Sequence, residues 1–244
     1  MLALLKKELS TFFASITGYL IVIIFLIIIG LFTWVFPGQF NLLEVGYANL
    51  DTIFILSPWI FLFLVPAVTM RLFSEEKKTG TLDILFTRPI SDFTIVLAKF
   101  ITGFLLVLIA LLPTVLYYVT IYLLGNPIGN IDTGATLGSY IGLLFLAAIY
   151  VSIGLFASSL TDNQIIAFLL GAVVCFVFFF GFDAIGSLTF LSSFSSIIYN
   201  LGINEHYQSI SRGVVDSRDI LYFLSIIVIF LLLTKTKLSS RKWN

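Results

Sequence analysis

The side chains best suited to bind a partner lie together in residues 71–92, RLFSEEKKTGTLDILFTRPISD, between two long apolar runs. The charged members are Arg71, Glu75, Glu76, Lys77, Lys78, Asp83, Arg88 and Asp92. Burying the four charges at 75–78 at the centre of a bilayer would cost roughly 10–14 kcal/mol, at about 2.5–3.5 for each residue. We therefore predict a solvated loop on one membrane face, to which a soluble protein can bind. The alternative is a plain turn that keeps two membrane spans apart.

Within this segment, the residue types predict a short helix with one charged and one apolar end. Ser74 is expected to cap a helix that begins with Glu75 and Glu76, because acids are favourable in a first turn. Gly80 interrupts the helix, and Pro89 ends the structured part near residue 88. The apolar end contains Leu82, Ile84, Leu85 and Phe86. A helix of this kind can dock in a groove while two spans anchor it.

Motifs for catalysis or metal binding are missing from the sequence. The dipeptide Gly-Lys never occurs, so there is no P-loop for ATP, and neither H-E-x-x-H nor G-x-S-x-G is present. His206 is the only histidine, and we interpret it as solvated or structurally bonded rather than catalytic. Cys175 is the only cysteine and lies in an apolar run, as expected of a small buried hydrophobe. The chain is not predicted to be an enzyme, to bind a metal or to bind nucleic acid.

The elements that hold this segment are predicted to be membrane helices. The chain is 59% hydrophobic and 11% charged, with a mean hydropathy of +1.11, and apolar runs of about 20 residues recur along it. We predict a single all-α transmembrane domain over residues 1–244. Its six spans are expected at about 18–36, 52–72, 100–124, 137–160, 165–182 and 220–234, with Pro113 interrupting the third and small residues enriched in the fourth.

Helices are also predicted outside the spans. In residues 2–16, one apolar stripe comprises Leu2, Leu5, Leu9, Phe12 and Ile16, which is typical of a helix lying in the membrane interface. Alternatively, this segment is simply the cytosolic start of the first span. Residues 92–99 are expected to form an elbow ahead of the third span. Between the fifth and sixth spans, apolar residues recur at helical spacing, namely Leu191, Phe194, Ile198 and Leu201, then Tyr207, Ile210 and Val214.

Those outer residues, 183–219, predict one or two helices that lie at or re-enter the outer interface. A surface loop with one amphipathic helix is the alternative. The span interiors lack ionisable side chains, with Lys99 and Asp183 expected at their edges. Ion-coupled transporters generally need such groups within the membrane, so an autonomous secondary transporter is disfavoured. Any transport would then draw its energy from another chain.

The distribution of basic residues predicts the orientation. Six spans place both termini and residues 71–99 on one face, which holds Lys6, Lys7, Arg71, Lys77, Lys78, Arg88, Lys99, Lys235, Lys237, Arg241 and Lys242. The other face holds only Arg212 and Arg218. Basic residues accumulate on the cytoplasmic side of membrane proteins. We therefore predict a multi-pass protein of the cytoplasmic (inner) membrane with both termini in the cytoplasm.

The run EEKKTGTLDILFTRPIS, followed by Lys99, resembles the E-E-K/R-x-T-G-T-(hydrophobic)-D/E-x-L signature of ABC-2 type transporter permeases. Residues 210–225, ISRGVVDSRDILYFLS, are similar to the last extracellular segment and final span of that family. The match covers nearly the whole chain. More narrowly, residues 40–85, FNLLEVGYANLDTIFILSPWIFLFLVPAVTMRLFSEEKKTGTLDIL, resemble GldF, the gliding-motility-associated group of permease subunits.

The resemblance implies a half-transporter that carries no ATP site of its own. In the family, two six-span subunits associate as a homodimer or heterodimer, and each engages a separate cytosolic ATPase that binds ATP and Mg²⁺. The interfacial helix and the loop between spans two and three form that contact, which here are residues 2–16 and 72–88. The family's outer helices correspond to residues 183–218. A GldG-like membrane subunit accompanies GldF-like subunits, and membrane lipids surround the spans.

Taken together, we predict a permease subunit that couples ATP hydrolysis on a partner chain to export of a substrate, in support of gliding motility. The residues expected to couple the two chains are Glu75, Glu76, Lys77, Lys78, Gly80, Thr81 and Asp83. One competing interpretation is a structural anchor or assembly factor of a motility or secretion machine, without transport. Another is an intramembrane enzyme, but the spans contain only scattered Ser, Thr and Asn instead of a converging polar set.

Overall fold

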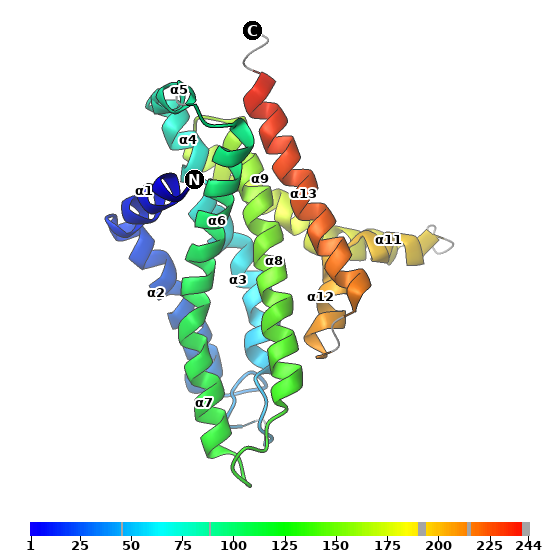
Figure 1. The fold of residues 1–244 in the computed structure, drawn as a ribbon. Helices are drawn as coiled ribbons and strands as arrows, with labels where there is room; N and C mark the ends of the chain where they lie inside the picture. The colour runs from blue at the N-terminus through cyan, green and yellow to red at the C-terminus, as the bar shows by residue number, and fades with distance from the viewer. Residues whose placement is uncertain (45, 88, 190–193, 214–215, 241–244) are drawn as a thin grey trace.

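The structure is a computed structural model that describes residues 1–44, 46–87, 89–189, 194–213 and 216–240 (Figure 1). Every regular element in these ranges is a helix, which confirms the predicted all-α fold. Six helical segments are long and apolar enough to cross a membrane: Gly18–Val35, Asp51–Lys78, Asp92–Leu124, Thr133–Leu160, Gln164–Gly186 and Ser217–Ser239. The six predicted spans are therefore confirmed, and several of them extend beyond their predicted ends.

Side-chain caps set the start of four of the long helices. Ser91, Asp132, Asn163 and Asp216 each accept a hydrogen bond from a backbone N–H in the first turn of the helix that follows. These helices are α6 (Asp92–Leu111), α8 (Thr133–Leu160), α9 (Gln164–Phe176) and α13 (Ser217–Ser239). Pro113 cannot donate to a helical hydrogen bond, and a short 3₁₀ segment, η2 (Leu112–Thr114), separates α6 from α7 (Val115–Leu124) as predicted.

α8 is the central helix of the bundle. It packs against α3 (Asp51–Thr69), α6, α9, α13 and α12 (Ile203–Ser211). Glycines allow the closest approaches, because a Cβ at Gly154 would collide with Thr69 Oγ1 and one at Gly142 would lie 3.0 Å from Ile210 Cγ2. The small residues predicted for the fourth span therefore lie where other helices cross it closely.

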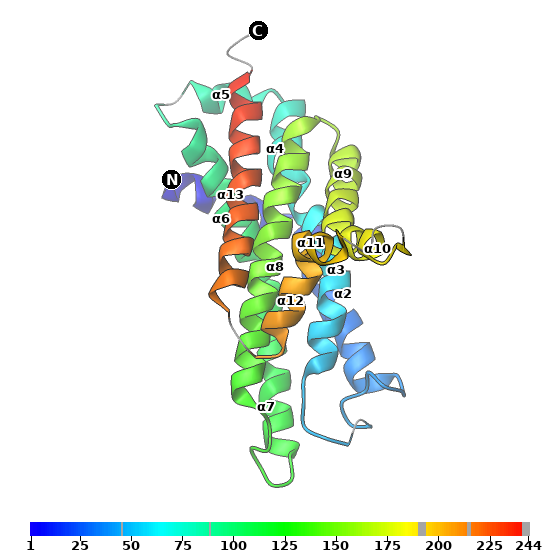
Figure 2. The same cartoon turned by 90° about the vertical axis from the view of Figure 1, so that its right-hand side faces the viewer.

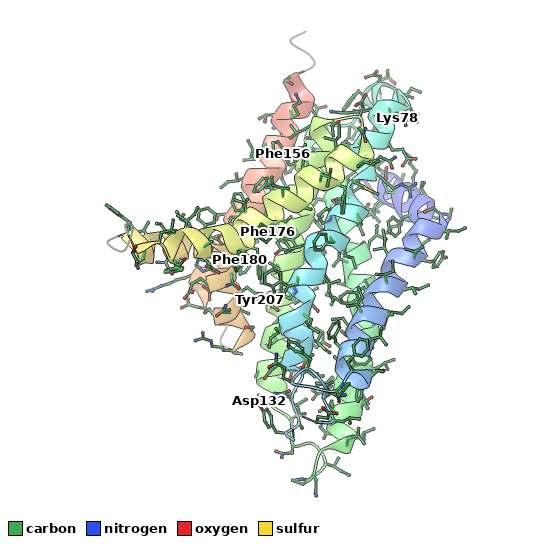
Figure 3. The ribbon with its side chains drawn as sticks, turned by 180° about the vertical axis from the view of Figure 1, so that it is seen from behind. Lys78, Asp132, Phe156, Phe176, Phe180 and Tyr207 are labelled. Atoms are coloured by element: carbon green, nitrogen blue, oxygen red, sulfur yellow. The ribbon has the colours of Figure 1, made fainter. Side chains whose placement is uncertain are left out.

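The two ends of the bundle differ in character. Figures 1 and 2 place α4 (Arg71–Lys78), α5 (Thr81–Phe86) and the C-terminal end of α13 at one end, here called the α5 end. The connections between η1 (Leu31–Val35) and α3 and between α7 and α8 lie at the opposite end. Seen from behind, Lys78 and Asp132 mark these two ends (Figure 3). The first span itself is α2 (Ile16–Gly30) continued by η1.

The N-terminal segment is a helix of its own, as predicted, and lies across the bundle near the α5 end (Figure 1). This helix, α1 (Leu2–Phe13), ends three residues earlier than the prediction and is followed by α2 after Ala14 and Ser15. The predicted apolar stripe is divided, because Phe12 is buried while Leu2 and Ile16 are exposed. The backbone is extended at Ser15, so Ile16 begins the next helix and does not continue the stripe of α1.

Between the fifth and sixth spans, the described residues form two helices, within the predicted number. The fifth span continues from α9 through η3 (Val177–Gly181) into α10 (Phe182–Gly186), and then α11 (Ser195–Leu201) and α12 follow. α11 projects sideways from the bundle, whereas α12 runs along α8 (Figures 1 and 2). Predicted positions Leu191 and Val214 lie outside the described residues. The interpretation of this region as a plain loop with one helix is wrong.

Residues 71–92 differ most from the prediction. Only Met70 separates α3 from α4, so the charged run at 75–78 continues the second span and is not part of a solvated loop. α6 begins at Asp92 without a break before Lys99, so the predicted elbow is absent.

Candidate functional site

α4 begins with a cap supplied by another helix. Ser158 of α8 accepts hydrogen bonds from the backbone N–H groups of Phe73 (3.0 Å) and Ser74 (3.1 Å). The same hydroxyl donates to the Met70 carbonyl at 2.8 Å. One hydroxyl thus uses its single donor and both acceptor positions at the joint between α3 and α4. Ser74 was predicted to be the cap, but its hydroxyl donates back to the Met70 carbonyl from inside the helix.

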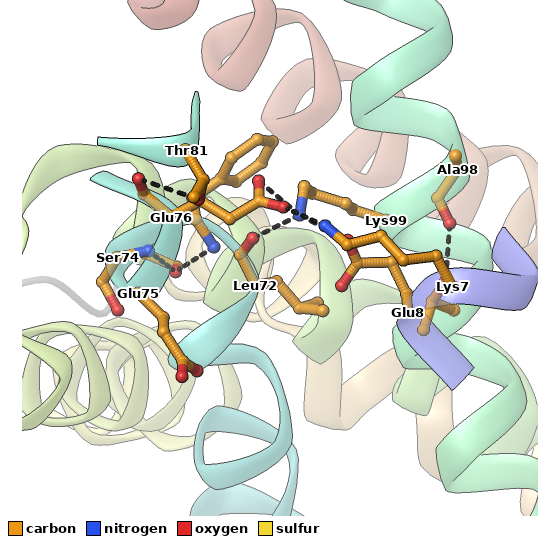
Figure 4. Close-up of polar contacts among 12 residues, drawn as sticks. Lys7, Glu8, Leu72, Ser74, Glu75, Glu76, Thr81, Ala98 and Lys99 are labelled. Carbon is orange, nitrogen blue, oxygen red and sulfur yellow. Dashed lines mark hydrogen bonds and ion pairs between the residues drawn. The ribbon is translucent and has the colours of Figure 1, made fainter. Parts of the chain in front are cut away.

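Close to this joint is a charge network of two lysines and two glutamates from three helices, defined here as Lys7, Glu8, Glu76 and Lys99 (Figure 4). Lys99 Nζ, on α6, lies 3.0 Å from Glu8 Oε1 and 2.9 Å from Glu76 Oε2. Lys7 Nζ donates to Glu76 Oε1 at 2.8 Å and lies 3.5 Å from Glu8 Oε1. The network therefore joins α1, α4 and α6.

Lys99 is the centre of the network. Its side chain is 0% exposed, and its Nζ also donates to the Leu72 carbonyl and lies 5.1 Å from the centre of the Phe73 ring. Glu76 Oε2 lies 2.9 Å from Lys99 Nζ, and we describe this contact as an ion pair because its geometry is not that of a good hydrogen bond. Lys99 was predicted at the edge of the third span, and it lies eight residues into the helical segment Asp92–Leu124 with its side chain fully buried. Two carboxylates compensate a lysine ammonium that is fully buried.

Lys7 shows how strongly the network favours its ionised form. Burial by itself lowers the pKa of Lys7, but the hydrogen bond and charge of Glu76, with the charge of Glu8, outweigh it. The net result is a pKa above the ordinary lysine value of 10.5. The network contains two lysines and two glutamates, so their formal charges cancel.

The other predicted residues of α4 point in different directions, because successive helical residues are about 100° apart. Glu75 accepts from Arg71 Nε at 3.0 Å on the partly exposed face. Lys77 Nζ donates to the Ser159 carbonyl at the end of α8. Lys78 is exposed. The four predicted coupling residues of α4 therefore differ in their surroundings. Glu76 is buried, Glu75 and Lys77 are bonded within the chain, and Lys78 is exposed.

α5 continues the exposed part of the site. Gly80 has φ of +70°, a left-handed conformation that strains other residues, and it turns the chain from α4 into α5. Thr81 Oγ1 lies 2.9 Å from Thr79 Oγ1. Asp83 and Ile84 are exposed, whereas Leu82 is buried. We call the exposed residues Lys78, Thr79, Gly80, Thr81, Asp83 and Ile84 the α4–α5 surface. Predicted position Arg88 lies outside the described residues.

The family resemblance placed residues 2–16 at the partner contact, but sequence patterns did not show that Lys7, Glu8, Lys99 and Ser158 contact α4. The available signal was a lone lysine, Lys99, between Ala98 and a long apolar run, combined with adjacent charges on an N-terminal helix. Their pairing spans 69 residues between Lys7 and Glu76 and 91 between Glu8 and Lys99. Within the described ranges, no group of three or more His, Cys, Asp or Glu is placed to hold a metal ion.

Comparison with known families gives one finding. A family model described as ABC-2 family transporter protein matches residues 2–242, which is nearly the full chain. No curated protein matches the sequence.

Proposed function

Because this chain belongs to the ABC-2 transporter family, a family of membrane permeases, we propose that residues 1–244 form one transmembrane domain whose α4–α5 surface and α1 bind a separate cytosolic ATPase. The observation that carries this proposal is the charge network. It joins α1 and α4 to α6, a membrane-spanning helix, through the buried ion pairs of Lys99 with Glu8 and Glu76. A half-exposed pair between Lys7 and Glu76 adds a second link between α1 and α4. A displacement of α4 by a partner would therefore move α6 and α8 with it.

The distribution of charge supports placing the α5 end in the cytoplasm. The described basic residues predicted for that side are Lys6, Lys7, Arg71, Lys77, Lys78, Lys99, Lys235 and Lys237. Arg88, Arg241 and Lys242, which complete the predicted set, lie outside the described residues. Under the positive-inside rule, both termini are then cytoplasmic and the protein lies in the cytoplasmic (inner) membrane.

On this proposal the chain is a non-catalytic subunit, and ATP and Mg²⁺ bind to the partner. A second six-span subunit, identical or different, completes the transporter, which exports its substrate. The resemblance of residues 40–85 to GldF supports a role in gliding motility beside a GldG-like subunit. Lys77, Lys78, Gly80, Thr81 and Asp83 remain proposed coupling residues, with Glu75 and Glu76 positioning α4 from inside the chain.

The proposal is tested by reversing charges on the α4–α5 surface. Lys78→Glu and Asp83→Lys change exposed side chains, so the fold should be unaffected. In liposomes that contain the permease and its co-purified ATPase, we expect each variant to lower permease-stimulated ATP hydrolysis at least fivefold. The thermal unfolding midpoint of each variant should match that of the unmodified protein.

Lys235→Glu is the matched control, because Lys235 is an exposed lysine of α13 that is not a member of the α4–α5 surface. It should keep full stimulation. Equal ATP hydrolysis in all three variants would reject the α4–α5 surface as the contact. An ATPase that co-purifies but hydrolyses ATP at the same rate with or without the permease would instead identify the chain as a structural anchor.

A further inference from the structure

His206, the only histidine in the chain, joins three helices away from the α5 end. Its Nδ1, on α12, lies 2.7 Å from Asp219 Oδ1 of α13. Its Nε2 donates to the backbone carbonyl of Asn200, on α11, at 2.9 Å. The ring also stacks on Tyr222 of α13, with ring centres 3.8 Å apart and planes 21° from parallel. One side chain thus holds α11 and α12 against the start of the sixth span.

These contacts require a defined number of protons. A carbonyl oxygen only accepts, so the contact with Asn200 requires a proton on Nε2. The 2.7 Å contact with Asp219 requires a second proton, either on Nδ1 or on the carboxyl group. In either form the two side chains together are neutral. Loss of one proton leaves a lone pair facing a lone pair at one of the two contacts and gives the two side chains one net negative charge.

The surroundings make that negative charge unfavourable. Asp219 is buried, and its other oxygen, Oδ2, has no hydrogen-bond donor among the described residues. α8 and η3, which also pack on α12, contribute no Asp, Glu, Lys, Arg or His. On α13 the titratable groups nearby are Tyr222, which contacts the ring, and Arg218, which is exposed.

The remaining charges near the ring come from α10 and α12. Asp183 of α10 accepts a hydrogen bond from Asn204, and Glu205 of α12 is exposed beside His206 in the sequence. Both are acidic, so neither compensates the charge that deprotonation would leave. His206 itself is 16% exposed, which allows protons to exchange with solvent.

We propose that His206 and Asp219 form a proton-controlled latch, which holds α11 and α12 on α13 while the shared proton is bound and releases them when it is lost. The latch acts on a cavity, because α12 forms one wall of a space of about 570 Å³ whose other walls are α3, η3 and the start of α8. Tyr207, next to the latch, lines this cavity and donates to the Phe54 carbonyl of α3 at 2.7 Å. The pH on that side of the membrane would therefore control the shape of the cavity.

Nuclear magnetic resonance tests the proton count directly, since ¹⁵N-labelled histidine reports only His206 in this chain. The full-length protein in lipid nanodiscs is titrated from about pH 5 to about pH 8, a range that brackets ordinary histidine ionisation. At the acidic end, we expect both ring nitrogens to be protonated and hydrogen-bonded. A ring that stays in one neutral tautomer across the whole range would overturn the proposal.

Electron paramagnetic resonance measures release of the latch. With Cys175→Ala as background, spin labels at Ile197 of α11 and Leu221 of α13 occupy exposed positions on either side of it. As the pH rises, the mean distance between the labels should lengthen or its distribution should broaden. The pH midpoint of this change should match that of the His206 titration. A histidine that titrates while this distance stays constant would equally overturn the proposal.

Asp219→Asn replaces the carboxylate with an amide, whose NH₂ group can donate to an unprotonated Nδ1 while Nε2 still donates to Asn200. Both contacts of His206 are then satisfied without the second proton, so the distance between the labels should no longer depend on pH. Glu205→Gln is the matched control, because Glu205 is an exposed acid adjacent to His206 without a described contact to the ring. Its midpoints should stay unchanged. The latch is independent of the ATPase contact, so it can be tested without the partner chain.

Discussion

At the scale of single residues, the least expected feature is Lys99, a fully buried lysine in a membrane-spanning helix. It is tolerated because Glu8 and Glu76 lie within 3.0 Å and 2.9 Å of its Nζ. Removing one partner from a buried ion pair costs more than the pair itself contributes, because the remaining charge is left without compensation. Any single substitution that changes the net charge of the network is therefore expected to destabilise the fold.

Lys99→Met should lower the free energy of unfolding by about 3 kcal/mol. The reason is that the carboxylates of Glu8 and Glu76 would then face each other, with Lys7 as the only positive charge of the network. The loss is measured as a lower thermal unfolding midpoint in detergent or nanodiscs. Lys78→Met, on the exposed α4–α5 surface, is the matched control and should leave the midpoint unchanged. Combining Lys99→Met with Glu76→Gln should recover part of the loss. Equal midpoints for both single variants would show that the network does not stabilise the fold.

At the scale of elements, the joint between α3 and α4 determines where the charged segment lies. Met70 has no side chain that can cap α4. The missing acceptor is the hydroxyl of Ser158 on α8, which is 85 residues from its donor Phe73 in the sequence. Because α8 also packs on α3, α6, α9 and α13, this single hydroxyl ties α4 to the centre of the bundle. The direction in which α4 leaves the membrane thus depends on α8.

Ser158→Ala should destabilise the protein by about 1–3 kcal/mol, because two backbone N–H groups lose a buried acceptor and one carbonyl loses a donor. Thermal unfolding gives the magnitude, and limited proteolysis should show faster cleavage between α4 and α5. Ser159→Ala is the comparison, since the Ser159 hydroxyl is equally buried but donates only to the Phe156 carbonyl of its own helix. If both alanine variants behave alike, Ser158 does not have the capping role that we assign to it.

At the scale of the whole molecule, the proposed orientation follows from the α5 end being basic and the opposite end being poor in basic residues. Cys175 is the only cysteine of the chain, so in a Cys175→Ala background a single introduced cysteine is the only site that a maleimide can label. Lys78 and Ile128 suit this purpose because they are exposed at opposite ends of the bundle.

In intact cells, Ile128→Cys should react with a membrane-impermeant maleimide, whereas Lys78→Cys should react only after the cells are permeabilised. The reason is that the bilayer separates the two ends and the basic end is retained in the cytoplasm. Labelling is measured by mass shift on denaturing gels. Reaction of Lys78→Cys from outside would invert the topology and remove the α4–α5 surface from reach of a cytosolic ATPase.

Local chemistry determines the number and type of the spans, and the sequence by itself was sufficient to predict them. Runs of apolar residues as long as a bilayer is thick have few alternatives to a membrane helix. The helix breaker Pro113 acts on its own neighbours, so its effect was also readable in advance. The interpretation of His206 as a structurally bonded histidine is confirmed by its contacts, although its partners were not predictable.

Only the tertiary structure decided which charges are buried. The cost of burying an ion was counted for each residue separately, and it predicted a solvated loop at 71–92. That count omitted compensating partners far away in the sequence, because Lys7 and Glu76 are 69 residues apart and Glu8 and Lys99 are 91 apart. Glu76 was assigned to a surface contact but belongs to the interior, while Lys7, Glu8 and Lys99 were not recognised as its partners. The physical reason is that an ion pair depends on the separation of two side chains in space, which the packing of α1, α4 and α6 sets and which no local pattern contains.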